Sequence, residues 1–204
     1  MKRSTFVRGG LLAILAALAG CSSMQDMGAG WTTLIDGNRG LENFDRLGTA
    51  SWRPQDGAIV ADSGTEGYLV TKKGYRDFQL RAEFWADHTT NSGIFLRSQN
   101  PAKIESASSY EVNIFDQRVD PVYGTGAIVN VAKVVPMPKA GGKWNVYEIT
   151  ARGSHLTVVL NGVQTVDVQD SKFVEGPVAL QYAPGANGIP GGAIKWRKVQ
   201  VREL

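Results

Sequence analysis

The chain has 204 residues, 43% of them hydrophobic and 20% charged, a size and mixture that can bury one sizeable core but hardly two. Its 22 basic and 19 acidic side chains give a formal net charge of +3, and Lys2, Arg3 and Arg8 account for that whole excess. The rest of the chain has equal numbers of basic and acidic residues. It lacks the positive charge typical of a nucleic-acid-binding protein, so we expect no nucleic-acid partner.

Residues 1–20 have the pattern of a signal peptide, with a basic start followed by an apolar run from Gly10 to Gly20. That run is too short to span a bilayer as a helix. The chain's single cysteine, Cys21, ends the stretch LAGC, which resembles the lipobox of bacterial lipoproteins. The resemblance implies that Cys21 is diacylated and becomes the new N-terminus; an ordinary secretory signal followed by an unrelated cysteine is the alternative.

Ser22 resembles the default signal that sorts lipoproteins to the outer membrane. We therefore expect a protein that is lipid-anchored to the bacterial outer membrane and faces the periplasm, with the anchor as its membrane contact. Residues 21–30 are small and polar without periodicity, which is typical of a flexible tether. We expect the folded domain to cover residues 31–204.

From Trp31 onward, short runs rich in Val, Ile, Phe and Tyr alternate with Gly, Asp and Asn, and no stretch keeps a helical apolar stripe for three turns. The pair Asn161-Gly162, between two alternating runs, is favoured in the tight turn of a β-hairpin. The other expected strands are Gly57–Ala61, Tyr68–Thr71, Phe78–Ala86, Gly93–Arg97, Tyr110–Phe115, Gly126–Val131, Trp144–Ala151, Pro177–Tyr182 and Ala193–Arg202. This many strands without an internal repeat predicts an all-β fold, a jelly-roll β-sandwich of two antiparallel sheets.

Within these strands, side-chain alternation separates an aliphatic face from a second face that carries charge, amides and rings. Arg97 is expected to project from this second face rather than enter the core. Such a face suits a sugar, because hydroxyls need polar partners and the C–H side of a pyranose packs on aromatic rings. An ordinary solvated outer face is the alternative. The residues placed on the second face are Glu83, Trp85, Phe95, Arg97, Glu111 and Asn113.

The two histidines, His88 and His155, match no metal-ligand spacing, and we expect neither a zinc site nor a cofactor. A calcium ion held by loop carboxylates and carbonyls stays open, since lectin-like sandwiches often have one.

Several stretches, in this order, resemble the bacterial 3-keto-disaccharide hydrolase family: WTTLIDG, GYLVTKKGYRDFQLRAEF, NSGIFLRS, YEVNIFD, KWNVYEITARGSHLTVVLNG and GPVALQ. The resemblance covers Trp31 to Leu204. It implies a concanavalin A-like jelly-roll fold and cleavage of 3-keto-glycosides, although some members have no demonstrated activity.

The chemistry implied by the resemblance begins with a C3 ketone, which acidifies the C2 proton. A carboxylate removes that proton, the aglycone leaves C1, and water then adds to the enone. The resemblance implies acid–base roles for Glu83, Glu111 and Asp116, without saying which is the base, and an enolate contact for Arg97. The implied substrate-binding residues are Trp85, Asn91, Phe95, Asn113 and Gln181.

Two other functions stay open at this point. Ordinary glycoside hydrolysis also uses paired carboxylates, at separations that the sequence does not give. A non-catalytic glycan-binding lipoprotein of the envelope would use the same mixed face for a carbohydrate ligand.

Overall fold

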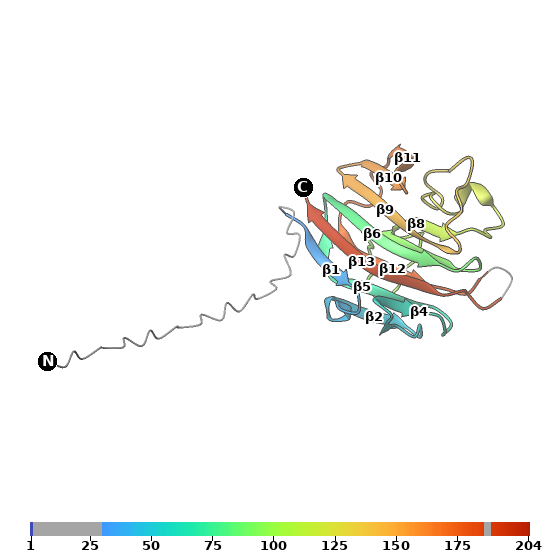
Figure 1. The fold of residues 1–204 in the computed structure, drawn as a ribbon. Helices are drawn as coiled ribbons and strands as arrows, with labels where there is room; N and C mark the ends of the chain where they lie inside the picture. The colour runs from blue at the N-terminus through green and yellow to red at the C-terminus, as the bar shows by residue number, and fades with distance from the viewer. Residues whose placement is uncertain (2–29, 186–188) are drawn as a thin grey trace.

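The computed structural model describes Met1, residues 30–185 and residues 189–204 (Figure 1). Two antiparallel sheets pack face to face in this part of the chain, which confirms the predicted all-β jelly-roll sandwich. Its described helical segments are two short 3₁₀ turns, Leu41–Asn43 and Pro121–Tyr123. No helix among the described residues is long and apolar enough to cross a membrane. Cys21, the predicted signal peptide and most of the predicted tether lie outside the described residues.

The larger sheet has eight strands in the order β11-β10-β9-β6-β13-β4-β3, and β1 also pairs with β13. The long strands β9, β6 and β13 lie side by side at its centre (Figure 1). The strand bounds are β1 Thr32–Asp36, β3 Arg53–Gln55, β4 Ala58–Ala61, β6 Phe78–Ala86, β9 Lys143–Arg152, β10 His155–Leu160, β11 Val163–Gln169 and β13 Ile194–Glu203.

The smaller sheet has five strands in the order β2-β5-β12-β7-β8. Its strands combine segments from the whole domain, so residues far apart in the sequence become neighbours on one surface. The bounds are β2 Phe44–Gly48, β5 Gly67–Tyr75, β7 Asn91–Leu96, β8 Tyr110–Phe115 and β12 Gly176–Tyr182.

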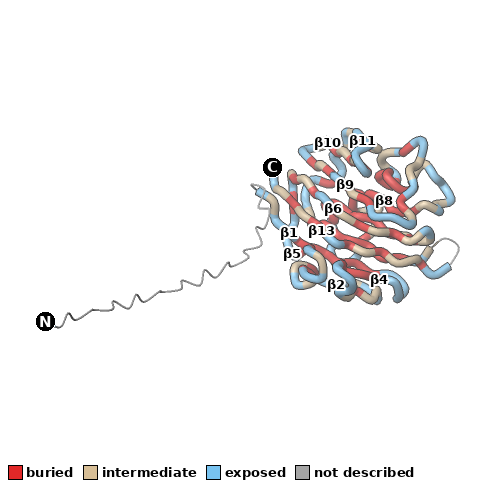
Figure 2. Tube along the Cα trace, viewed as in Figure 1, coloured by how far each residue is buried: buried red, intermediate tan, exposed pale blue. Residues whose placement is uncertain are grey.

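The core lies between the sheets and is built by the predicted alternation. Figure 2 shows buried stretches along the strands of both layers. Phe84 stacks on Tyr147 with ring centroids 5.2 Å apart, and Trp196 packs beside Phe84 at 5.7 Å. The first described strand begins at Thr32, and the first residue of the core cluster is Leu34. The part of the chain from Trp31 onward therefore contains every described strand and the whole of that cluster.

Most predicted strands are confirmed, and β6 and β8 have the predicted bounds. Asn161 and Gly162 have positive φ angles of 52° and 81°, as the predicted hairpin turn requires. The predicted strand Gly126–Val131 is wrong. Its backbone adopts positive φ at Gly126 and Asn130, and Ile128 forms isolated bridges instead of a ladder. The sequence prediction also omits β1, β2 and β3.

Candidate functional site

The outer face of the five-stranded sheet carries a pocket of about 470 Å³. Neighbouring strands bring its floor residues into register, with Tyr68 on β5 opposite Gln181 on β12, and Phe95 on β7 opposite Glu111 on β8. The segment from Ala102 to Ser106 forms part of its wall. All five strands of this sheet and one connecting segment thus contribute residues to a single concave site.

Glu111 is the buried carboxyl group of this pocket, and 8% of its surface is exposed. Burial raises its pKa to about 7, and the negative charge of Glu66 acts in the same direction. The positive charge of Arg118 and a hydrogen bond from Ser106 lower the pKa and limit the shift. Near neutral pH both protonation states are therefore populated, so this side chain can accept a proton and give it back.

A second carboxylate, that of Glu66, is exposed at the same pocket. The Tyr68 hydroxyl donates a hydrogen bond to its Oε1 atom at 2.7 Å, and Nε2 of Gln181 lies 3.4 Å from the same oxygen. Gln181 Nε2 also donates to the Tyr68 oxygen at 3.3 Å. Burial, followed by the bond to Glu66, raises the pKa of Tyr68, so its hydroxyl stays protonated as a hydrogen-bond donor.

Gly93 is packed closely beneath the polar groups of the floor, where a larger residue would crowd them. A Cβ atom at this position would lie 3.5 Å from Cγ of Glu111, 3.6 Å from Oε1 of Gln181 and 3.1 Å from the carbonyl oxygen of Val112. Oε1 of Gln181 is buried and accepts no hydrogen bond from the described residues. Gln181 lines the pocket, so a sugar hydroxyl bound there is a donor suited to this oxygen.

Apolar groups form the rest of the pocket. The rings of Tyr68 and Phe95 meet edge to face with centroids 5.6 Å apart, and Ile104 packs on the same cluster. Leu47 packs against this cluster and also lines the pocket. A third carboxyl group of the pocket, that of Glu105, is paired with Lys103 at 2.8 Å. The site therefore combines three carboxyl groups, an amide and a phenol with apolar side chains, a mixture that suits a carbohydrate ring.

Three of the predicted site residues, Glu111, Gln181 and Phe95, come together in this pocket. Glu83 and Trp85 lie on β6 in the other sheet, where Nε of Arg197 donates to Glu83 at 2.7 Å. The expectation that Glu83 shares one concave face with Glu111 is wrong, because alternation separates the faces of a strand without saying to which sheet the strand belongs.

Arg97 does not face the pocket, and the expectation that it projects from the second face is also wrong. It follows the end of β7 with a positive φ of 51°, which breaks the alternation, and 1% of its surface is exposed. Its guanidinium donates to carbonyl oxygens of Arg76 and Gly153 at 2.8 Å and of Phe173 at 3.1 Å, and it pairs with Asp77 at 3.3 Å. The side chain thus ties four segments of the sandwich together.

The remaining predicted residues do not line this pocket either. Asp116 accepts hydrogen bonds from the Thr125 hydroxyl at 2.7 Å and from the backbone of Ala140 and Gly141, so it fixes the connection between β8 and β9. Asn113 is buried and donates to the Tyr123 carbonyl at 2.7 Å. Asn91 donates to the Pro184 carbonyl at 2.6 Å.

Glu66 and Tyr68 are pocket residues that the sequence prediction missed. They lie two residues apart at the start of β5. Glu66 comes just before the strand, so from its residue type alone it is indistinguishable from an ordinary acidic residue of a surface loop. The available signal was the alternation in EGYLV, which places Glu66, Tyr68 and Val70 on one face.

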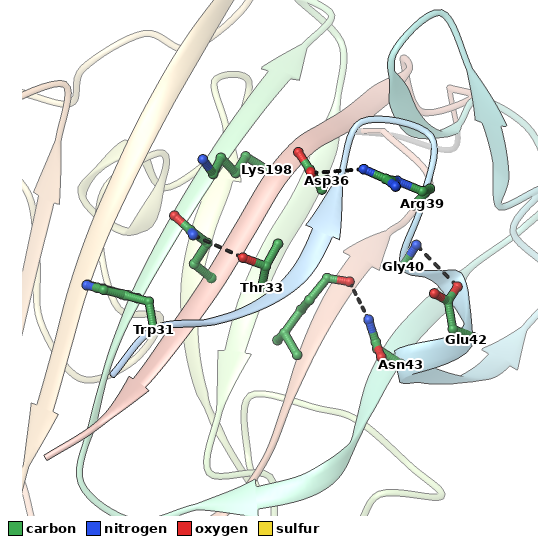
Figure 3. A pocket seen from close by; sticks show the side chains of 10 residues that line it. Trp31, Thr33, Asp36, Arg39, Gly40, Glu42, Asn43 and Lys198 are labelled. Atoms are coloured by element: carbon green, nitrogen blue, oxygen red, sulfur yellow. Dashed lines mark hydrogen bonds and ion pairs between the residues drawn. The ribbon is translucent and has the colours of Figure 1, made fainter. Parts of the chain in front are cut away.

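A second hollow of about 400 Å³ lies beside β1 and is lined by Trp31, Asp36, Glu42 and Lys198 among others (Figure 3). Its polar groups are largely engaged with one another. Arg39 pairs with Asp36 at 3.4 Å, and the backbone N–H of Gly40 donates to Glu42 at 3.2 Å. Its carboxylates are exposed, so it lacks the buried acid that distinguishes the pocket around Glu111.

No group of three or more His, Cys, Asp or Glu side chains is arranged to hold a metal ion within the part of the chain that the structure describes.

Comparison with known proteins adds independent information about this fold and site. A family model for the 3-keto-alpha-glucoside-1,2-lyase-like domain matches residues 30–202. No curated protein matches the chain.

Solved structures with the same architecture come from carbohydrate-related proteins. Two candidate glycosyl hydrolases from Parabacteroides distasonis have TM-scores of 0.71 and 0.68, with sequence identities of 17% and 22%. Each match covers 86% of this chain, and 94% and 100% of the respective structures. A carbohydrate binding module from Bacillus subtilis has a TM-score of 0.53 at 17% identity, with coverage of 85% and 96%. At these identities the likeness establishes a shared fold.

Proposed function

The chain belongs to the family of 3-keto-alpha-glucoside-1,2-lyase-like domains, and we propose that its Glu111 pocket cleaves 3-keto-glycosides by proton abstraction and elimination. The family is the one that the sequence motifs predict. It supports a carbohydrate-related function, while the reaction and the residues that perform it are our proposal.

The reaction starts when ionised Glu111 takes the proton from C2 of the sugar, next to the C3 ketone. The electron pair of the C2–H bond passes into an enolate and then into a C1–C2 double bond, and the C1–O bond to the aglycone breaks. The leaving oxygen takes a proton from water. The hydroxide left from this water adds to C1 of the enone and a proton is delivered to C2, so the net change is hydrolysis by one water molecule.

The pocket supplies groups suited to these steps. Burial makes ionised Glu111 a stronger base than an exposed carboxylate. Protonated Glu111 then exchanges its proton with solvent and gives a solvent proton to C2 during hydration. Glu66 accepts hydrogen bonds from Tyr68 and Gln181 and orients both side chains. The Tyr68 oxygen and Oε1 of Gln181 can then accept hydrogen bonds from hydroxyls of the sugar. Phe95 and Ile104 provide the apolar surface for the C–H side of the ring.

One observation carries the proposal: Glu111 is buried in the pocket, with its pKa raised to about 7 by that burial. A carboxyl group that serves only to keep a surface hydrated is normally exposed to water, because burial disfavours its ionised form. Perturbed acids in concave pockets are typical of catalytic sites.

The test uses residues 22–204, which contain every described strand. This protein is incubated with a panel of 3-keto-disaccharides and the matching unoxidised sugars, and the products are separated by chromatography. We expect cleavage of at least one keto-sugar and none of its unoxidised partner. Cleavage of both at similar rates would point to ordinary glycoside hydrolysis instead.

A non-catalytic glycan-binding protein is the second candidate function, and the shared fold with a carbohydrate binding module favours it. This candidate uses the same pocket for a ligand that is not altered. Saturable binding of a sugar without any product would support it and would reject the enzyme.

We also propose that Cys21 anchors the protein by lipid to the bacterial outer membrane. The lipobox-like stretch before Cys21 and the small, polar composition of residues 22–30 support this placement.

A further inference from the structure

The outer face of the eight-stranded sheet carries three tryptophans that the proposed reaction does not use. Trp85 on β6 and Trp144 on β9 are partners in the register, and 38% of the surface of Trp144 is exposed. Trp31 lies against outward residues of the same two strands, including Gln79 and Thr150. The other two tryptophans of the chain, Trp52 and Trp196, are buried in the core, so this face collects all the accessible ones.

Each of these tryptophans is covered by a basic side chain. The guanidinium carbon of Arg197 lies 4.3 Å from a ring centroid of Trp144, and Nζ of Lys195 lies 4.6 Å from that of Trp85. The corresponding distance from Arg202 to Trp31 is 5.0 Å. All three basic residues belong to β13, so one strand places a row of positive charges next to the indole rings.

The central strands of this face carry an excess of positive charge. The outward acidic residues of β9, β6 and β13 are Glu83 and Glu148, and Glu83 is already paired with Arg197. The outward basic residues on the same strands are Arg81, Arg152, Lys195, Arg197, Lys198 and Arg202. Outside residues 1–20 the chain is neutral in total, so the centre of this face is more positive than the chain as a whole. The outer strands of the same face also carry Asp36 on β1 and Asp167 on β11.

Accessible tryptophans could bind either a glycan or a lipid surface. The basic side chains over the rings indicate which of these two ligands fits. A pyranose stacks on a bare ring face, whereas each indole here already has a cation near its ring. Indoles and basic side chains together suit the interface of a membrane, where the ring sits at headgroup level and the cation meets anionic lipid.

We propose that this face, defined by Trp31, Trp85, Trp144, Lys195, Arg197 and Arg202, docks on an anionic phospholipid surface. The Glu111 pocket lies on the outer face of the opposite sheet, so docking leaves it open to soluble sugars.

The position of the proposed anchor is compatible with this orientation. The described fold begins at Gly30, next to Arg202 and Trp31, at the edge of this same face. The nine residue-to-residue steps from Cys21 to Gly30 can span at most about 32 Å, so a lipid on Cys21 keeps the domain close to the bilayer. The docking itself does not depend on the anchor or on catalysis.

The test measures sedimentation of residues 22–204, which carry no acyl chain, with vesicles of phosphatidylcholine alone or with 30% phosphatidylglycerol. We expect binding to the anionic vesicles that weakens as salt is raised. Lys195→Glu should reduce the partition coefficient by about tenfold or more, because each basic residue near an anionic surface contributes a severalfold increase in binding. Trp144→Ser should weaken binding without changing the charge.

The matched control is Lys72→Glu, which makes the same charge change at an exposed position on β5 of the other sheet. We expect this variant to bind like the original protein, and far-UV circular dichroism should show the same fold for all variants. Absence of vesicle binding, or an equal loss in Lys72→Glu, would overturn the proposal. Binding of a soluble glucan that depends on Trp144, without vesicle binding, would instead identify the face as a glycan site. None of these results depends on whether the protein cleaves keto-sugars.

Discussion

Replacing Glu111 by glutamine keeps the size of the side chain but removes a buried ionisable group, so the variant should lose turnover and gain stability at alkaline pH. The turnover part follows from the proposed acid–base role. Such roles contribute about 10²–10⁴-fold to rate, and kcat on a 3-keto-disaccharide should fall on that scale.

The stability part follows from the raised pKa. In the folded protein the pKa of Glu111 is about 7, against an ordinary value of 4.5, so the native state binds this proton more tightly than the unfolded chain does. Ionising the buried group therefore destabilises the fold, progressively between pH 4.5 and 7 and by a constant amount above pH 7. At about 1.36 kcal/mol for each tenfold change in proton affinity, the full effect is about 3 kcal/mol.

The assay is urea unfolding at pH 4.5 and pH 8.5. We expect Glu111→Gln to match the original protein at pH 4.5 within 1 kcal/mol or so, and to exceed it by about 3 kcal/mol at pH 8.5. The control is Glu148→Gln, which neutralises an exposed carboxylate on β9 and should show no comparable pH dependence. An excess stability of Glu111→Gln that is equal at both pH values would refute the reasoning that burial perturbs this group.

Three further changes test other parts of the structure. Arg97→Met should destabilise the fold by about 3–5 kcal/mol in urea unfolding, because three carbonyl groups lose their donor; a loss under 1 kcal/mol would contradict the tying role. Tyr68→Phe should lower kcat/KM by about tenfold or more, since a hydrogen bond to a charged group contributes about 1.5–3 kcal/mol, and unchanged kcat/KM would remove the Tyr68–Glu66 pair from the site. Cys21→Ser should move the protein to soluble fractions or leave its precursor unprocessed, whereas unchanged membrane association would reject the anchor.

The alternation of side chains explains why the fold was predictable. It gave the bounds of β6 and β8, and the Asn161-Gly162 pair located the hairpin between β10 and β11. These signals are local, since they depend on residues next to each other in the chain. The sandwich followed because strands with one apolar face must bury it against a second sheet.

The site was only partly predictable, because it depends on which strands become neighbours. Glu111, Phe95 and Gln181 were found from alternation together with the family motifs. Glu83 has the same local pattern but lies on the other sheet, and no local signal distinguishes the two cases. The prediction for Arg97 is wrong because a positive φ at this residue ends the alternation, and its guanidinium bonds carbonyl groups of segments far away in the sequence.

The central claim is that Glu111 removes the C2 proton of a 3-keto-glycoside, and deuterium at that carbon tests it most directly. The rate of cleavage by residues 22–204 is compared for a 3-keto-disaccharide with protium or deuterium at C2, and NMR follows the C2 position of the product formed in D₂O. We expect slower cleavage of the deuterated sugar and solvent deuterium at C2 of the product, with both signals lost together with turnover in Glu111→Gln. Equal cleavage rates, with the original C2 hydrogen retained in the product, would contradict the elimination and leave direct hydrolysis as the reaction.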